Sequence, residues 1–291
     1  IQTSACNYYE AVTQPEVEQY YEEKKRAVHT DTPPSFGLNS RLVKCDGGLV
    51  EEMYRADGLY GAAIHEIIHW LELAQEVAEN DCQCHVISLL VAYYRTGDLR
   101  LFDEYSIAWL KEQEGQVDFI NGFIEVYGDP LGMKASWEGI VEYKDMEATR
   151  RTQTISSHAQ WFEDHAPISP QFRKKQVKGV TAHVVCAAML GGDEYPSTAI
   201  GINLPNAEWI RAMYGSKSVT IGNLTEAYNK VAHGNGFLDE FVIDGQTRAM
   251  IERYGDLCDD LHTDLHECLG HGSGQLLPGV DADALKAYGN T

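Results

Sequence analysis

The chain has 291 residues, a hydrophobic fraction of 44% and a formal net charge of −21 at pH 7. This length allows one large domain or two ordinary ones with a substantial core. The negative charge argues against a nucleic-acid partner, because backbone phosphates require clustered Lys and Arg. It also disfavours an anionic membrane surface, and no segment has the uninterrupted apolar length of a transmembrane helix. We therefore expect neither nucleic acid nor a membrane among the partners.

The spacing of apolar residues predicts mostly helices with a small irregular sheet built from separated strands. In chain order, the predicted elements are a helix over 14–28, strands at 40–44 and 49–54 joined by a turn at 46–48, helices over 62–79, 81–94 and 99–113, a strand over 119–127, a helix over 145–164, strands over 180–189 and 198–204, and helices over 222–232 and 246–269. The fold class is therefore mostly α with a small mixed β-core.

The cysteines indicate a cellular compartment. There are seven, an odd number, and they are scattered along the chain. Several lie in helical or apolar patterns, which favours buried free thiols in a reducing compartment over a disulfide framework. No signal peptide is visible, although the chain begins at Ile1 rather than Met. On this basis we expect a cytoplasmic protein.

The run His-Glu-Cys-Leu-Gly-His at 266–271 resembles a zinc-hydrolase signature with one residue too many. In the standard motif, His-Glu-x-x-His, the histidines lie four apart, roughly 40° from each other around a helix. Five steps place His266 and His271 about 140° apart, so a shared ion requires a wider π-turn. Gly270 is the residue best suited to that distortion. Spacing alone leaves open whether this is a zinc site with Glu267 as base or a helix end with ordinary histidines.

A second motif has the regular spacing. His65, Glu66 and His69 form His-Glu-x-x-His within an apolar helical pattern. No third ligand is singled out downstream, so a structural role on an amphipathic helix is favoured. The motif remains the alternative metal site.

Two further pairs carry suitable chemistry. On a strand, Glu125 and Tyr127 would point to the same face, offering a carboxylate for an ammonium and a phenol for an oxyanion. Asn203 and Asn206 flank a proline at the end of a strand, where two amides could project into a cleft. By spacing alone, a surface Glu–Tyr pair and a polar turn are favoured.

Three segments together resemble the dipeptidyl peptidase III family. Residues 121–132, followed by 137–139, are similar to its G-F-I-E-x-Y-x-D-P-x-G…E-G segment. Residues 201–206 with 222–223 are similar to its G-I-N-x-P-N…G-N stretch, and 266–274 match its H-E-x-x-G-H-G-S-G motif. The three occur in the family's order.

The resemblance implies a zinc-dependent exopeptidase that releases dipeptides from the amino terminus of short peptides. It implies two zinc ligands, His266 and His271, with Glu267 as general base and Tyr127 stabilising the oxyanion. The residues that it implies for holding the substrate's amino terminus are Glu125, Asn203, Asn206 and Glu138. A strand near 199–203 would pair with the extended peptide.

The resemblance also implies two lobes around a cleft. We expect a lower lobe with the β-core and the peptide-binding strand in residues 1–145 and 187–232. A partial upper helical lobe, which carries the zinc, would comprise residues 146–186 and 233–291.

One part of the family pattern is absent. Family members take a third zinc ligand from a Glu in a later E-E-x-x-A-[ED] motif, yet no Glu follows Glu267. We therefore expect an internal fragment that binds one Zn²⁺ poorly and is inactive without the remaining part of the enzyme, which would be its partner alongside the peptide substrate. The alternatives are a different zincin that uses His65, Glu66 and His69, or a non-catalytic peptide-binding fragment.

Overall fold

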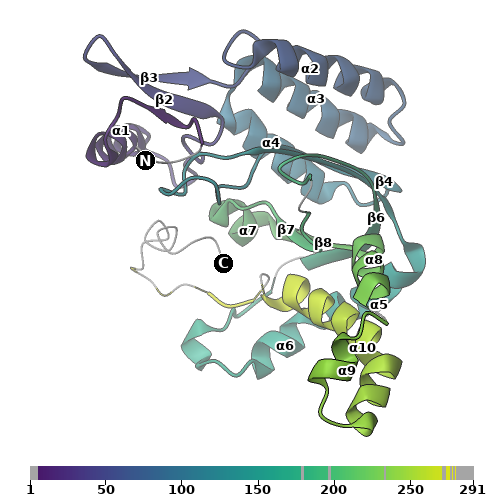
Figure 1. The fold of residues 1–291 in the computed structure, drawn as a ribbon. Helices are drawn as coiled ribbons and strands as arrows, with labels where there is room; N and C mark the ends of the chain where they lie inside the picture. The colour runs from purple at the N-terminus through teal and green to yellow at the C-terminus, as the bar shows by residue number, and fades with distance from the viewer. Residues whose placement is uncertain are drawn as a thin grey trace.

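Helices lie on both sides of a five-stranded sheet, and a three-stranded sheet stands at one end of the molecule (Figure 1). The computed structural model describes residues 6–177, 180–195, 198–232, 234–270, 273–275, 277 and 279. Within them, helices contribute more residues than strands, and both sheets mix parallel with antiparallel pairs. The predicted fold class is confirmed.

The N-terminal segment forms the small sheet and one helix beside it. Thr13 and Glu16 make a capping box, in which the Thr13 N–H donates to Glu16 Oε2 at 2.8 Å, so the helix begins where the sequence predicts. The next two strands join at Asp46 and Gly47, both with positive φ, which suits a tight hairpin turn. The elements are β1 (Tyr9–Glu10), α1 (Gln14–Ala27), β2 (Ser40–Cys45) and β3 (Gly48–Met53).

Three amphipathic helices cover one face of the larger sheet. Side chains cap two of them: Asn80 Oδ1 accepts from the Gln83 N–H at 2.8 Å, and Asp98 Oδ1 accepts from the Arg100 N–H at 2.9 Å. Gly97, with a φ of 75°, ends the helix before Asp98 and starts the turn. The helices are α2 (Gly61–Glu76), α3 (Asp81–Thr96) and α4 (Leu99–Lys111).

The larger sheet has the strand order β4-β5-β6-β8-β7. Only β6 and β8 pair in parallel; the other neighbours are antiparallel. Since β7 ends this order, no other described strand pairs with its outer edge. The strands are β4 (Val117–Phe123), β5 (Trp137–Lys144), β6 (Val180–Gly192), β7 (Gly201–Leu204) and β8 (Ser216–Ile221).

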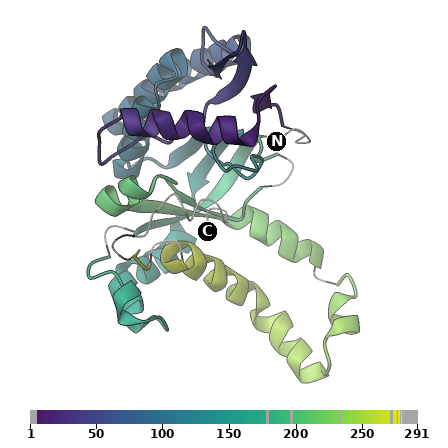
Figure 2. The same ribbon diagram turned by 90° about the vertical axis from the view of Figure 1, so that its left-hand side faces the viewer.

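The remaining helices include a second layer on the opposite face. Helices α5 and α8 pack on β6, α10 contacts both of them, and α7 packs on α4. Figure 2 shows α9 and the first turns of α10 extending away from the sheet. The elements are α5 (Met146–Ser157), α6 (Ala159–His165), the 3₁₀ turn η1 (Pro170–Phe172), α7 (Glu208–Tyr214), α8 (Gly222–Ala232), α9 (Phe237–Phe241), α10 (Gly245–Leu265) and the π-turn η2 (His266–Gly270).

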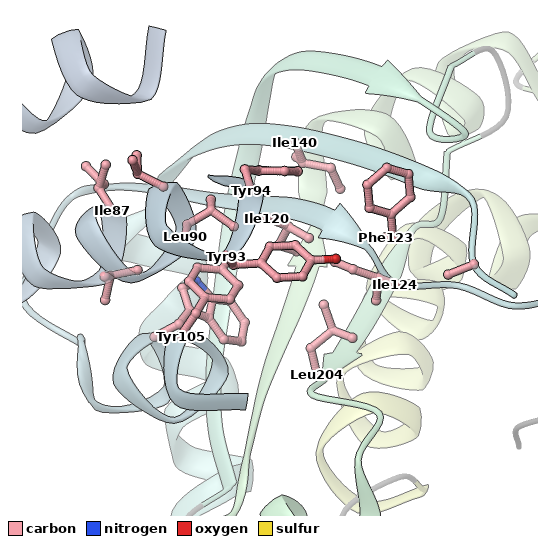
Figure 3. Packing of buried hydrophobic residues seen from close by; sticks show 14 of the residues in the cluster. Ile87, Leu90, Tyr93, Tyr94, Tyr105, Ile120, Phe123, Ile124, Ile140 and Leu204 are labelled. Carbon is pink, nitrogen blue, oxygen red and sulfur yellow. The ribbon is translucent and has the colours of Figure 1, made fainter. Parts of the chain in front are cut away.

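The main hydrophobic core lies between α2–α4 and the larger sheet (Figure 3). Leu90, Tyr93 and Tyr94 from α3 are almost fully buried there against Ile120 and Ile140 of the sheet. Tyr94 also accepts a hydrogen bond from Trp137 Nε1 at 2.8 Å. This bond ties the helical layer to the start of β5, where the Trp137-Glu138-Gly139 motif begins.

Some local predictions were wrong. The helix expected over 145–164 is broken at His158, because Ser156 and Ser157 donate back to helical carbonyls and His158 takes a non-helical φ and ψ. The cysteines are free, as expected, within the described residues, but they are exposed or partly exposed rather than buried.

Two broader expectations are not resolved by the fold. In the described part of the chain, no helix is long and apolar enough to cross a membrane, while the cytoplasmic location stays a prediction. The division into two lobes also stays a prediction, and its boundary at 186/187 falls inside β6.

Candidate active site

Glu125 and Tyr127 lie on the loop after β4, not on a strand as predicted. The ladder with β5 ends at Phe123, and only single bonds continue it, such as Ser136 N–H to Glu125 O at 2.9 Å. The chain must then turn, because the Asp129 carboxylate accepts from the backbone N–H groups of Leu131, Met133 and Lys134. The two side chains therefore owe their placement to this braced loop rather than to strand alternation.

Asn203 and Asn206 come from the end of β7 and the segment that follows it. Asn203 is buried, and its Nδ2 donates to Ser216 Oγ at 3.1 Å and Ser218 Oγ at 2.7 Å on β8. Arg211 of α7 holds the segment in place, donating to Pro205 O at 2.6 Å and Asn203 O at 2.8 Å. These bonds fix both amides with respect to the sheet.

A hydrogen bond joins the two motifs. Asn206 Nδ2 donates to Glu125 Oε1 at 2.9 Å across 81 positions of sequence. Burial raises the pKa of Glu125, and the negative charge of Glu194 raises it further, while Asn206 and Arg211 counteract part of the shift. The predicted carboxylate and one of the predicted amides thus form a single polar site.

Glu138 lies in the same site. It is 4% exposed on β5, and burial, followed by a hydrogen bond with Glu194 and the charge of Glu125, raises its pKa well above the usual range. Its Oε1 has no partner among the described residues. Tyr127 is 75% exposed, and partial desolvation together with Glu125 and Glu138 raises the pKa of its hydroxyl. This phenol therefore stays protonated at neutral pH and can donate a hydrogen bond.

The run at 266–271 contains the π-turn that its spacing requires. η2 covers His266–Gly270, and in a π-turn residues five apart take the relation that residues four apart have in an α-helix. Gly270 does not take a left-handed conformation, and a Cβ there would meet only the His266 ring at ordinary contact distance, so its expected special role is not observed. His266 is exposed; the Glu267 side chain and His271 lie outside the described residues.

Asp264 anchors the helix just before His266. Its buried carboxylate accepts from Arg151 Nε at 3.0 Å, Thr152 Oγ1 at 3.1 Å and Thr220 Oγ1 at 3.2 Å. After the motif, the buried Glu163 of α6 accepts from the Gly274 N–H at 3.0 Å. Because η2 contacts β6, β7 and β8, these bonds hold His266 close to the strand that carries Asn203.

This geometry can be compared with known proteins. A family model described as peptidase family M49 matches residues 46–287, which is most of the chain. The chain belongs to peptidase family M49.

Similar proteins carry the same family name. Dipeptidyl peptidase 3 of Rattus norvegicus is 26% identical over 262 residues, covering 89% of this chain and 34% of the relative. Dipeptidyl peptidase 3 of Homo sapiens is 27% identical over 220 residues, covering 75% of this chain and 29% of the relative. A solved structure of DPP III from Caldithrix abyssi shares the fold, with a TM-score of 0.75 at 23% identity, over 92% of this chain and 49% of that one. The chain thus spans about a third of the length of these curated relatives.

The alternative metal motif lies elsewhere in this M49 chain. His65, Glu66 and His69 are exposed on α2, in the helical layer on the opposite face of the sheet from α10 (Figure 1). In the described part of the chain, no group of three or more His, Cys, Asp or Glu side chains is placed to hold a metal.

Three residues important to the M49 site were not predicted from the sequence. Glu194 adds a third carboxyl group beside Glu125 and Glu138, Arg211 orders the Asn203–Asn206 segment, and Asp264 anchors the π-turn. Arg211 and Glu194 belong to no motif. Only the position of Asp264 gives a weak sequence signal. It lies two residues before His266, on the part of the helix that contacts the sheet.

Proposed function

We propose that this protein is a zinc-dependent metallopeptidase that releases dipeptides from the amino terminus of short peptides. The observation that carries this proposal is the hydrogen bond from Asn206 to Glu125, which joins two distant motifs beside the strand that η2 contacts. Membership of M49 and the dipeptidyl peptidase names of the relatives support it.

The donor chemistry fits zinc. The imidazoles of His266, with which the π-turn begins, and of His271, five positions later in the sequence, would hold the ion together with one carboxylate. That carboxylate would come from the remaining part of the enzyme, which we infer to be the partner of this region. A bound zinc ion supplies Lewis-acid activation for hydrolysis.

The chain's own residues would bind and orient the peptide. Glu125, Asn206 and Glu138 offer acceptors for its terminal ammonium, and Asn203 adds its amide oxygen because Nδ2 already donates to two serines. The outer edge of β7, with which no other described strand pairs, would add the peptide backbone as a further strand. A terminus held at a set distance from η2 would place the second peptide bond for cleavage.

Two side chains would act on that bond. Glu267, directly after the ligand His266, would take a proton from the attacking water. The Tyr127 hydroxyl, which stays protonated, would donate to the developing oxyanion.

Substitution of Glu267 separates this function from its alternative. In the full-length protein, we expect Glu267→Ala to retain zinc and to lose at least about 100-fold in kcat, because the base is removed and the ligands are not. His65→Ala should retain both zinc and turnover. Metal analysis and peptide hydrolysis measure these outcomes. Loss of zinc in His65→Ala would favour the zincin that uses His65 and His69, and a wild-type protein without zinc would favour a peptide-binding role.

A further inference from the structure

The turn that carries Tyr127 is short and exposes that side chain. The Asp129 N–H donates to Val126 O at 3.0 Å and closes the turn around Tyr127. The Tyr127 side chain is 75% exposed, so few packing contacts fix its ring, and the place of its hydroxyl depends on the backbone of the turn. Whatever holds residues 126–129 therefore also holds the proposed oxyanion donor.

Asp129 receives a hydrogen bond from a distant element. Three donors to its buried carboxylate are backbone N–H groups of the loop itself. A further donor is the hydroxyl of Tyr9 on β1, which lies 2.7 Å from Asp129 Oδ2 and 120 positions earlier in the sequence. A hydroxyl that donates to a carboxylate makes a stronger bond than one between two neutral groups. Tyr9 thus ties the turn to a part of the fold outside the loop.

The small sheet gives this bond a firm support. β1 pairs with β2, where the Leu42 N–H donates to Tyr8 O at 2.9 Å. Tyr8 is buried against the turn, since a Cβ added at Gly128 would lie 3.3 Å from its hydroxyl oxygen. At the other end of the loop, Nζ of the fully buried Lys134 donates to Ser40 Oγ on β2 at 3.0 Å. The small sheet therefore holds the loop at both ends.

We propose that Tyr9 is a positioning residue for the proposed peptidase reaction: through Asp129 it holds the turn where the Tyr127 hydroxyl can reach the oxyanion. This inference rests on the proposed function. Because Tyr9 acts through Asp129 and not on the peptide, its loss should leave peptide binding unchanged. A catalytic group misplaced by 1 Å can lower a rate by up to about 100-fold, so the effect should appear in kcat.

The test is a double-mutant cycle in the zinc-loaded, full-length protein, measured by steady-state hydrolysis of tetra-alanine. Tyr9→Phe removes the hydroxyl and keeps the ring, and we expect kcat to fall about tenfold while KM changes less than about twofold. Tyr127→Phe, which removes the oxyanion donor, should lower kcat about 100-fold. In the doubly substituted protein, kcat should match that of Tyr127→Phe within about twofold, because the displaced side chain no longer has a hydroxyl to misplace.

Two further variants separate positioning from a loss of folding. Asp129→Asn changes the other partner of the bond with little change of shape. It should also lower kcat alone and add no loss in the Tyr127→Phe background. Tyr228→Phe, at an exposed position of α8, is the matched control and should behave as the wild type does. Near-UV circular dichroism gives the folded fraction of each variant, by which its rate is divided.

The outcomes distinguish the two proposals. If Tyr9→Phe keeps the wild-type kcat, raises KM instead, or lowers kcat tenfold again in the Tyr127→Phe background, the positioning role is refuted and the proposed function stands. If Tyr127→Phe keeps full turnover, or the wild-type protein does not hydrolyse tetra-alanine, the proposed function is itself wrong at that point and this inference fails with it.

Discussion

Glu142 on β5 has an environment that opposes its charge. It is 1% exposed, it lies directly opposite Asp118 in the β4–β5 register, and neither carboxyl oxygen has a partner among the described residues. Burial, followed by the charge of Asp118, raises its pKa to about 8, although Lys217 and Lys144 oppose the shift. The folded protein therefore holds this proton more tightly than the unfolded chain does.

The sign of the resulting pH dependence is definite. Between the unfolded pKa and about 8, the folded state binds more protons, so this group's contribution to the free energy of unfolding falls as pH rises. We expect the contribution of Glu142 to the free energy of unfolding to fall by roughly 3 kcal/mol between pH 5 and pH 8. In Glu142→Gln, the loss should vanish, and urea denaturation at both pH values measures it. Because both proteins contain the other titrating groups, such as His183, the difference between variant and wild type isolates Glu142. If the free energy of unfolding depends on pH equally in both proteins, Glu142 is not responsible for the loss.

Asn206 is exposed yet bonded to Glu125, so its removal should affect binding more than folding. We expect Asn206→Ala to raise KM for short peptides about tenfold, the equivalent of one hydrogen bond to a charged group, with a small change in kcat. Steady-state kinetics provide the measurement. Gln19→Ala, at an exposed position of α1, is a control that should match the wild type. A fall in kcat at constant KM would instead place Asn206 in the chemical step.

Among the elements, those with local signals were predictable from the sequence. The α1 capping box, the turn at Asp46 and Gly47 and the apolar spacing of α2 through α4 each specify structure within a few residues. The π-turn was also anticipated, because a zinc site with five-residue spacing permits little else. Its confirmation is a geometric result about His266–Gly270, not about the metal.

Other elements depend on tertiary contacts and could not be predicted from the local sequence. β8 contains Lys217, a charged residue that local sequence rules would not place in a buried strand. Its Nζ donates to Asp118 Oδ2 at 3.0 Å and to the carbonyl of Glu112, and these tertiary contacts compensate its burial. β5 places glutamates on its buried face, against the usual alternation. For the same reason, the place of Glu194 in the site could not be predicted. Glu138 lies 56 positions before it in the sequence, and no spacing rule connects the two.

The anchor of α10 gives a prediction for that element. Arg151 binds two acids, the fully buried Asp264 and the partly exposed Asp260, each at 3.0 Å. Asp264→Ala should cost about 2 kcal/mol, because it removes a fully buried acceptor from the partly exposed Arg151 and from the hydroxyls of Thr152 and Thr220. Asp260→Ala should cost less than about 1 kcal/mol. Chemical denaturation compares the two, and zinc affinity should fall only in Asp264→Ala. Equal losses of stability in the two variants would show that Asp264 stabilises the protein no more than Asp260 does.

At the scale of the whole molecule, α8–α10 present apolar side chains to the solvent. Val231, Phe241, Ile243, Met250 and Leu257 are all exposed. The curated relatives are about three times as long as the matched region, so a protein of that length has material to cover this face. Apolar patches of this kind normally mark interfaces.

Dye binding tests that expectation. Residues 1–291 alone should strongly enhance the fluorescence of an apolar dye such as ANS, whereas a protein of the relatives' length should do so several-fold less. Phe241→Ser combined with Ile243→Ser should lower the signal of the short form only. Equal dye binding by both forms would show that this surface is not covered.

The bonds of Asp264 also limit where the protein can move. They tie the last turn of α10 to α5 and to Thr220 on β8, and β8 is bonded in turn to β7. A rotation between the proposed peptide-binding edge and the proposed metal-binding turn would have to break this buried network. In contrast to the division into two lobes expected from the sequence, we therefore expect the two to move together, with any hinge that closes around a peptide lying outside this bonded unit.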